Sequence, residues 1–128
     1  LTADAGAAGD LARRLNMRPR TLAGACAREG LPAPRRLQAW MRVLLGAALL
    51  EEPGRSVVNA ARGAGYANDT ALRRALRDMA GPQALVRGKA FDTCARGFTD
   101  ELRELRERAR ERRRAARPRG AGREDDEP

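Results

Sequence analysis

Residues 56–79 read SVVNAARGAGYANDTALRRALRDM, and this stretch decides the fold class. Ser56 can cap a short helix over 57–64, because its hydroxyl can accept a hydrogen bond from a free backbone N–H of the first turn. A Gly-Tyr-Ala-Asn turn follows, and Asn68 or Asp69 can cap a second helix that fills the rest of the stretch. We therefore predict a helix, a tight turn and a second helix, which together form a helix-turn-helix unit.

An earlier part of the chain repeats this pattern about 48 residues upstream. Asp10 can cap a short helix that ends at Leu15, and residues 16–18 then form a turn. Pro19 suits the first position of the next helix, where its missing N–H would be unpaired in any case, and Gly30 suits the end of that helix. The chain is thus predicted to hold two helix-turn-helix units.

Composition agrees with an all-α fold, because Ala, Leu, Arg and Glu favour helices while β-branched and aromatic residues are few. A long linker helix over 34–50 is predicted to join the two units. Its expected apolar stripe is Leu37, Trp40, Met41, Leu44, Leu45, Ala48 and Leu49. We divide the chain into a double helix-turn-helix domain (1–97), a charged C-terminal helix (98–117) and a disordered tail (118–128), with a separate short helix over 89–96 inside the domain.

The net charge is +9, and 25 of the 26 basic residues are Arg, which points to a polyanionic partner. Residues 98–128 hold 10 basic and 9 acidic residues, so this Arg-rich part contributes only +1. Its opposite charges recur at three- and four-residue spacings, a pattern typical of an exposed helix. The excess charge lies in residues 1–97, where the two helix-turn-helix units are predicted.

Several classes of function are disfavoured by the sequence. Without His there is no His-based catalytic pair and no imidazole metal ligand. Cys26 and Cys94 lie far apart and are read as small core residues, so we expect no metal, no cofactor and no enzyme activity. The longest apolar run, 43–50, is far shorter than the roughly 20 residues of a membrane span. A cytoplasmic protein that does not enter a membrane is expected.

The ordered pieces resemble the DNA-binding domain of AraC/XylS-type transcription regulators. The resemblance runs over about residues 10–88 and is sharpest in the second unit, from Ser56 to Tyr66 and from Thr70 to Arg77, followed by Gly81-Pro82. The first unit matches with its Leu11–Met17 and Pro19–Leu22 segments. The resemblance implies a sequence-specific, bacterial transcription regulator that inserts the second helix of each unit into the DNA major groove.

The resemblance also implies which residues face the bases. In the first unit they are Arg20, Thr21, Ala23 and Gly24. In the second unit they are Asp69, Thr70, Arg73 and Arg74, with Arg77 near the DNA backbone. The residue pattern agrees for the second unit, because Arg73, Arg74 and Arg77 share one solvent-side arc opposite an apolar face.

Double-stranded DNA is therefore the expected partner. RNA polymerase is a candidate second partner, and the oligomeric state is left open. A linker helix of 17 residues would span roughly 25 Å, which places the two second helices near one DNA turn apart, about 34 Å. The chain opens on Leu1 rather than Met, which is compatible with a fragment, and no sensor domain is expected in it.

Three alternatives stay open. The chain could be a helical protein-interaction module that uses the charged helix over 99–116, with DNA binding weak or lost. It could bind RNA without sequence preference through the arginines of 112–119. If the chain does bind DNA, Asp69 could cap its helix instead of contacting a base. The small Ala23 and Gly24 would also leave the first unit with fewer base contacts.

Overall fold

The computed structural model describes residues 12–117, and all regular structure in that range is helical. This confirms the all-α prediction. Residues 12–14 are helical and are followed by α2 (Pro19–Arg28), α3 (Pro34–Leu50), α4 (Val57–Gly63), α5 (Asp69–Ala80), the short 3-10 helix η1 (Pro82–Leu85) and α6 (Ala90–Ala116). The predicted cap at Asp10 and the predicted disordered tail lie outside the described residues.

The turn of the first unit is built from two backbone hydrogen bonds around a left-handed residue. Asn16 has φ +56°, a conformation that Asn tolerates better than most residues. The Met17 N–H donates to the Ala12 carbonyl at 2.8 Å, and the Asn16 N–H donates to the Arg13 carbonyl at 3.0 Å. This pair of bonds ends the first helix and reverses the chain toward α2.

The turn of the second unit uses the same two bonds. Gly65 has φ +90°, and its N–H donates to the Arg62 carbonyl at 3.0 Å, while the Tyr66 N–H donates to the Ala61 carbonyl at 2.8 Å. The following helix is capped by Asn68, whose side-chain oxygen accepts from the Ala71 N–H at 2.9 Å. The internal repeat seen in the sequence is therefore a repeat of one turn geometry.

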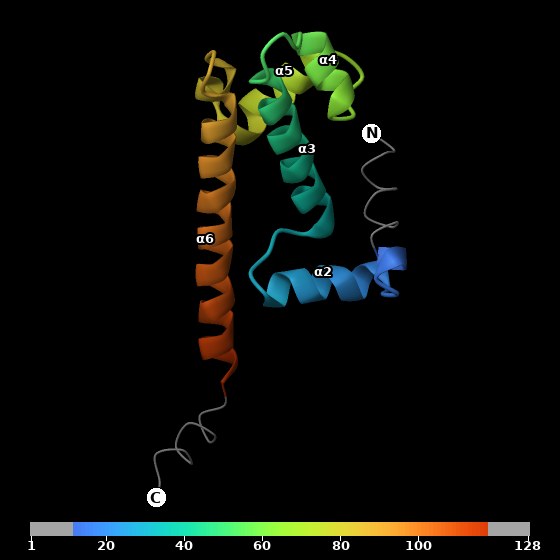
Figure 1. Cartoon of the computed structure of the whole chain (residues 1–128). Helices are drawn as coiled ribbons and strands as arrows, with labels where there is room; N and C mark the ends of the chain where they lie inside the picture. The colour runs from blue at the N-terminus through green and yellow to red at the C-terminus, as the bar shows by residue number, and fades with distance from the viewer. Residues whose placement is uncertain (1–11, 118–128) are drawn as a thin grey trace, which may run out of the picture.

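Within residues 12–117, the helices enclose two separate hydrophobic clusters. The larger one lies where α3, α4, α5, η1 and α6 meet, and consists of Trp40, Val43, Ala47, Ala60, Ala61, Leu72, Leu76, Ala84, Ala90 and Cys94. The smaller one belongs to the first unit and consists of Ala12, Leu22 and Cys26, with Met17 partly buried against them. Figure 1 shows α4 and α5 at one end of α3, α2 at its other end, and α6 running alongside.

The predicted apolar stripe of α3 is wrong in part. Met41 is 44% exposed, Leu45 is 47% exposed and Ala48 is exposed as well, while Val43 and Gly46 are buried in their place. Gly46 is needed for this arrangement, since a Cβ there would lie 2.6 Å from Leu72 Cδ1. The glycine lets α3 and α5 approach closely, and the buried face of α3 is rotated toward it.

The predicted separation of a short helix from the charged C-terminal helix is also wrong, because Ala90–Ala116 is one continuous helix. The expected boundary between residues 97 and 98 falls inside it. Gly97 does not break the helix but allows close packing, since a Cβ there would lie 3.0 Å from Trp40 Cη2. Next to it, the rings of Phe98 and Trp40 lie 5.5 Å apart. The N-terminal half of α6 is thus part of the main core.

Candidate nucleic-acid interface

Helix α5 has one buried and one exposed face. Leu72 and Leu76 are almost fully buried, and their spacing of four residues directs both into the main core. The opposite arc is exposed and carries Thr70, Arg73, Arg74 and Arg77. Four of the five residues predicted for this helix therefore share a single solvent-facing surface, and the residue pattern indicated this for the three arginines.

Asp69 has a different role from a cap. Asn68 caps the helix, and Asp69 is the first residue of α5. The Asp69 Oδ2 atom lies 3.9 Å from Arg73 Nε. Both side chains are well exposed, and such surface pairs contribute only about 0–1 kcal/mol, so Arg73 can exchange this partner for another anion. Within residues 12–117, neither Arg74 nor Arg77 has an ion-pair partner in the structure.

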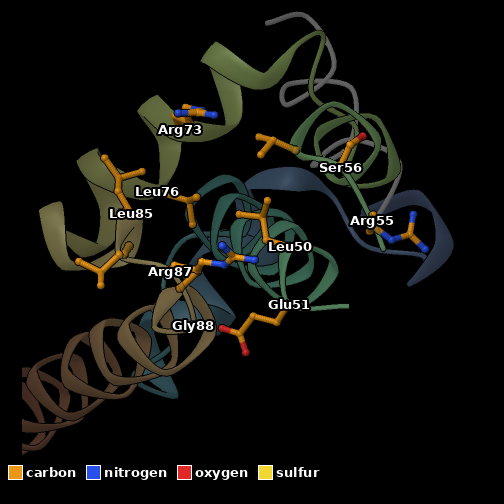
Figure 2. A pocket seen from close by; sticks show the side chains of 13 residues that line it. Leu50, Glu51, Arg55, Ser56, Arg73, Leu76, Leu85, Arg87 and Gly88 are labelled. Atoms are coloured by element: carbon orange, nitrogen blue, oxygen red, sulfur yellow. The ribbon is translucent and has the colours of Figure 1, made fainter. Parts of the chain in front are cut away.

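A pocket of about 410 Å³ adjoins α5 where the end of α3, the start of α4 and the η1–α6 connection meet. Figure 2 shows Arg73 at one side of it, above the apolar side chains of Leu50, Leu76 and Leu85. Glu51, at the end of α3, accepts a hydrogen bond from the Phe91 N–H at 2.9 Å, which ties α3 to the start of α6. Helix α5 itself packs against α3, α4, η1 and α6.

Helix α2 exposes fewer hydrogen-bonding side chains than α5. Leu22 and Cys26 are buried, whereas Arg20 and Thr21 are exposed and Gly24 is partly exposed. Figure 1 shows α2 and α5 at opposite ends of α3, so the predicted residues form two separate surfaces rather than one.

The buried residues allow the two surfaces to be compared position by position. Leu22 and Cys26 of α2 correspond to Leu72 and Leu76 of α5, because each pair faces its own core at the same spacing. In that register, the three arginine positions of α5 are occupied in α2 by Ala23, Gly24 and Ala27. The exposed hydrogen-bonding side chains of α2 are thus Arg20 and Thr21 at its N-terminal end and Arg28 at its last residue.

Arg28 was not among the residues that the sequence predicted for the exposed surface of α2. Its Nη1 lies 3.5 Å from the point where a Cβ of Gly24 would be, so the guanidinium extends along the backbone of α2 over the glycine. Arg28 is exposed and stands four residues after Gly24. This i, i+4 spacing was the available signal, because residues four apart are neighbours on a helix surface.

Replacing Gly24 by alanine is expected to raise the free energy of unfolding by about 0.5–1 kcal/mol. Gly24 lies inside α2, and the added Cβ would make only ordinary contact with Arg28. Chemical denaturation followed by circular dichroism measures the change. The reverse substitution at the exposed neighbour, Ala23→Gly, is expected to lower the free energy by a similar amount. A less stable Gly24→Ala variant would contradict this account of α2.

The two cysteines are both buried and serve as core residues. Burial raises the pKa of the Cys94 thiol to about 11, and the negative charge of Glu51 adds to the shift, so Cys94 is protonated at neutral pH. Within residues 12–117, no group of three His, Cys, Asp or Glu side chains is arranged to hold a metal ion.

The fold and its two exposed helix surfaces define a double helix-turn-helix domain. Residues 11–83 match the family model of a helix-turn-helix domain, of the AraC type. This match covers more than half of the 128 residues, and the chain therefore belongs to the AraC/XylS-type family of DNA-binding domains. At the family level it is a DNA-binding transcription regulator, and the alternative of a protein-interaction module is not favoured.

Neither a curated protein nor a solved structure shows significant similarity to the chain. Among the described helices, none is long and apolar enough to cross a lipid bilayer.

Proposed function

We propose that this domain binds DNA in a sequence-specific manner by inserting α2 and α5 into two successive segments of the major groove. The observation that carries the proposal is the exposed arc of α5, where Thr70, Arg73, Arg74 and Arg77 stand opposite the buried Leu72 and Leu76. A helix fits the major groove, and residues on such an arc can reach base edges and phosphates together. The site of action is the DNA of a bacterial cytoplasm.

Arginine side chains would supply both affinity and specificity. A guanidinium can donate two hydrogen bonds to O6 and N7 of guanine, and each such contact discriminates against a wrong base by about 1–3 kcal/mol. Arg73 and Arg74 take this role, and Arg77 contacts the phosphate backbone. Phosphate contacts position the protein and make binding depend on salt, because bound arginines release counterions from DNA.

The two half-sites would be read unequally. Helix α2 offers Arg20 and Thr21 near its N-terminus, with Gly24 behind them, while α5 offers Asp69 and Thr70 at its start and three arginines beyond. Asp69 would accept from a base donor such as the amino group of cytosine once Arg73 has turned to the DNA. The second half-site therefore carries most of the sequence information, and the first mainly adds affinity.

Selection of binding sites from a random DNA library tests this function. The expected result is a bipartite site with a guanine-bearing, well-defined half and a less defined half about one helical turn away. A salt titration on the selected duplex should show a linear fall of log K with log salt, and a random duplex should bind more weakly. Equal binding to selected and random duplexes would contradict sequence-specific recognition.

A further inference from the structure

Among the described residues, the core of the first helix-turn-helix unit is small. It consists of the buried Ala12, Leu22 and Cys26, with Met17 partly buried against them, and it is a cluster separate from the main core. Helix α2 packs against α3 and α6. The separation of α2 from α5 therefore depends on the contacts of α2 with these two helices, including those at its C-terminal end.

The C-terminal half of α6 holds that end directly. Arg112 Nη2 donates to the carbonyl of Ala27 at 3.1 Å, and Arg113 Nη2 donates to the carbonyl of Arg28 at 2.7 Å. These carbonyls belong to the last turn of α2, where the helix dipole is negative, and the Ala27 carbonyl also accepts from the Gly30 N–H at 3.2 Å. Cationic donors are the partners that such carbonyls favour most.

The backbone that follows α2 also lies close to the backbone of α6, at a position on α6 that precedes Arg112. Gly30, with φ +72°, follows α2, and a Cβ there would lie 3.0 Å from the Cα of Arg106. One turn further along α6, Ala109 is only 4% exposed. A glycine and an alanine thus let the chain after α2 lie against α6, and the two arginines then close the contact.

The other half of α6 is anchored in the main core. Ala90 and Cys94 are buried there. One turn beyond Gly97, Glu101 accepts three hydrogen bonds from the Arg36 guanidinium at the start of α3, the shortest at 2.7 Å. The same contact lowers the pKa of the Glu101 carboxyl below its ordinary value, against the opposing effect of its partial burial. One rigid helix of 27 residues, about 40 Å long, therefore connects the second unit with the end of α2.

We propose that α6 is a strut that fixes the position of α2 relative to α5, and that Arg112 and Arg113 set the DNA half-site spacing that the domain accepts. The inference rests on the proposed function for its DNA consequence. Arg112 and Arg113 are positioning residues that bind protein carbonyls rather than DNA. The most Arg-rich stretch of the chain is in this way a structural element.

The strut can be tested without DNA. Cysteines introduced at the exposed Thr21 and Thr70 carry spin labels, and pulsed electron spin resonance measures the distance distribution between α2 and α5. The parent chain without these substitutions reports any labelling of the buried Cys26 and Cys94. The Arg112→Ala/Arg113→Ala variant is expected to broaden the distribution. Distributions that are the same in parent and variant would overturn the strut.

A matched control removes the same charge from the same helix. Arg110 and Arg114 are exposed on α6 and make no hydrogen bond or ion pair with α2 among the described residues. The Arg110→Ala/Arg114→Ala variant is expected to keep the narrow distribution. A second variant, Arg112→Lys/Arg113→Lys, keeps the cations and is expected to broaden it less than the alanine pair. Equal broadening in the control would overturn the assignment to Arg112 and Arg113.

The DNA arm uses the selected duplex and versions with base pairs inserted between the half-sites, up to about five, which is half a helical turn. The parent and the Arg110→Ala/Arg114→Ala control should strongly prefer the original spacing. In Arg112→Ala/Arg113→Ala, the ratio of affinities for original and altered spacing should fall toward one. An unchanged ratio would overturn the strut. A parent that selects no sequence would instead overturn the proposed function, while the spin-label result still decides the strut.

Discussion

Replacing Trp40 by alanine is expected to lower the free energy of unfolding by about 3–5 kcal/mol. Trp40 is 1% exposed and lies in the main core, where the ring of Phe98 and the backbone at Gly97 pack against it. Domains of this size are commonly stable by about 5–15 kcal/mol, so the variant would lose a large share of its stability. Chemical denaturation followed by circular dichroism measures this loss.

The adjacent residue provides the control. Met41 is 44% exposed on the same helix, and Met41→Ala is expected to change the free energy of unfolding by no more than about 0.5 kcal/mol. The rotated apolar stripe of α3 rests on this contrast. If Met41→Ala were as destabilising as Trp40→Ala, the buried face of α3 would be misassigned.

Replacing Arg73 and Arg74 together is expected to have the largest effect on DNA recognition. Each arginine that contacts guanine contributes about 1–3 kcal/mol of discrimination, so the double alanine variant should nearly lose its preference for the selected second half-site over a scrambled one. Neighbouring positions are coupled, and the two effects need not add. Competition binding with both duplexes at fixed salt measures the preference.

Two further variants separate specificity from charge. Arg73→Lys/Arg74→Lys keeps the positive charge but loses the paired guanidinium donors, and it should retain affinity for random DNA while losing discrimination. Arg110→Ala/Arg114→Ala changes the net charge by the same amount as the Arg73 and Arg74 alanine pair, and it should keep the preference. A double alanine variant at Arg73 and Arg74 that still prefers the selected half-site would show that α5 does not read those bases.

Local features of the fold could be predicted from the sequence because they depend on a few adjacent residues. Pro19 and Pro34 each begin a helix, and Ser56 accepts from the Asn59 N–H at 3.1 Å as a cap should. Of the two candidates for the cap of α5, the geometry selected Asn68, and Asp69 instead lies near Arg73. Turns and helix caps depend on interactions between adjacent residues, so the sequence is sufficient to locate them.

Features that depend on contacts between distant segments were predicted poorly. The apolar stripe of α3 was placed on the wrong face at Met41 and Leu45, since Leu, Met and Ala occur almost all round that helix and periodicity alone does not decide between faces. The helix predicted over 89–96 is continuous with the charged helix, because tertiary packing against Trp40 gives Gly97 a use inside one helix.

The sequence by itself determined an all-α chain with two helix-turn-helix units, the exposed arginine arc of α5 and the family, because helix periodicity and turn residues are encoded locally. Only the tertiary structure decided what the charged C-terminal helix does. Its charges balance one another along the sequence, which indicated an exposed helix without a defined role. The contacts of Arg112 and Arg113 with the end of α2 join residues 85 positions apart, and such a separation leaves no periodic trace in the sequence.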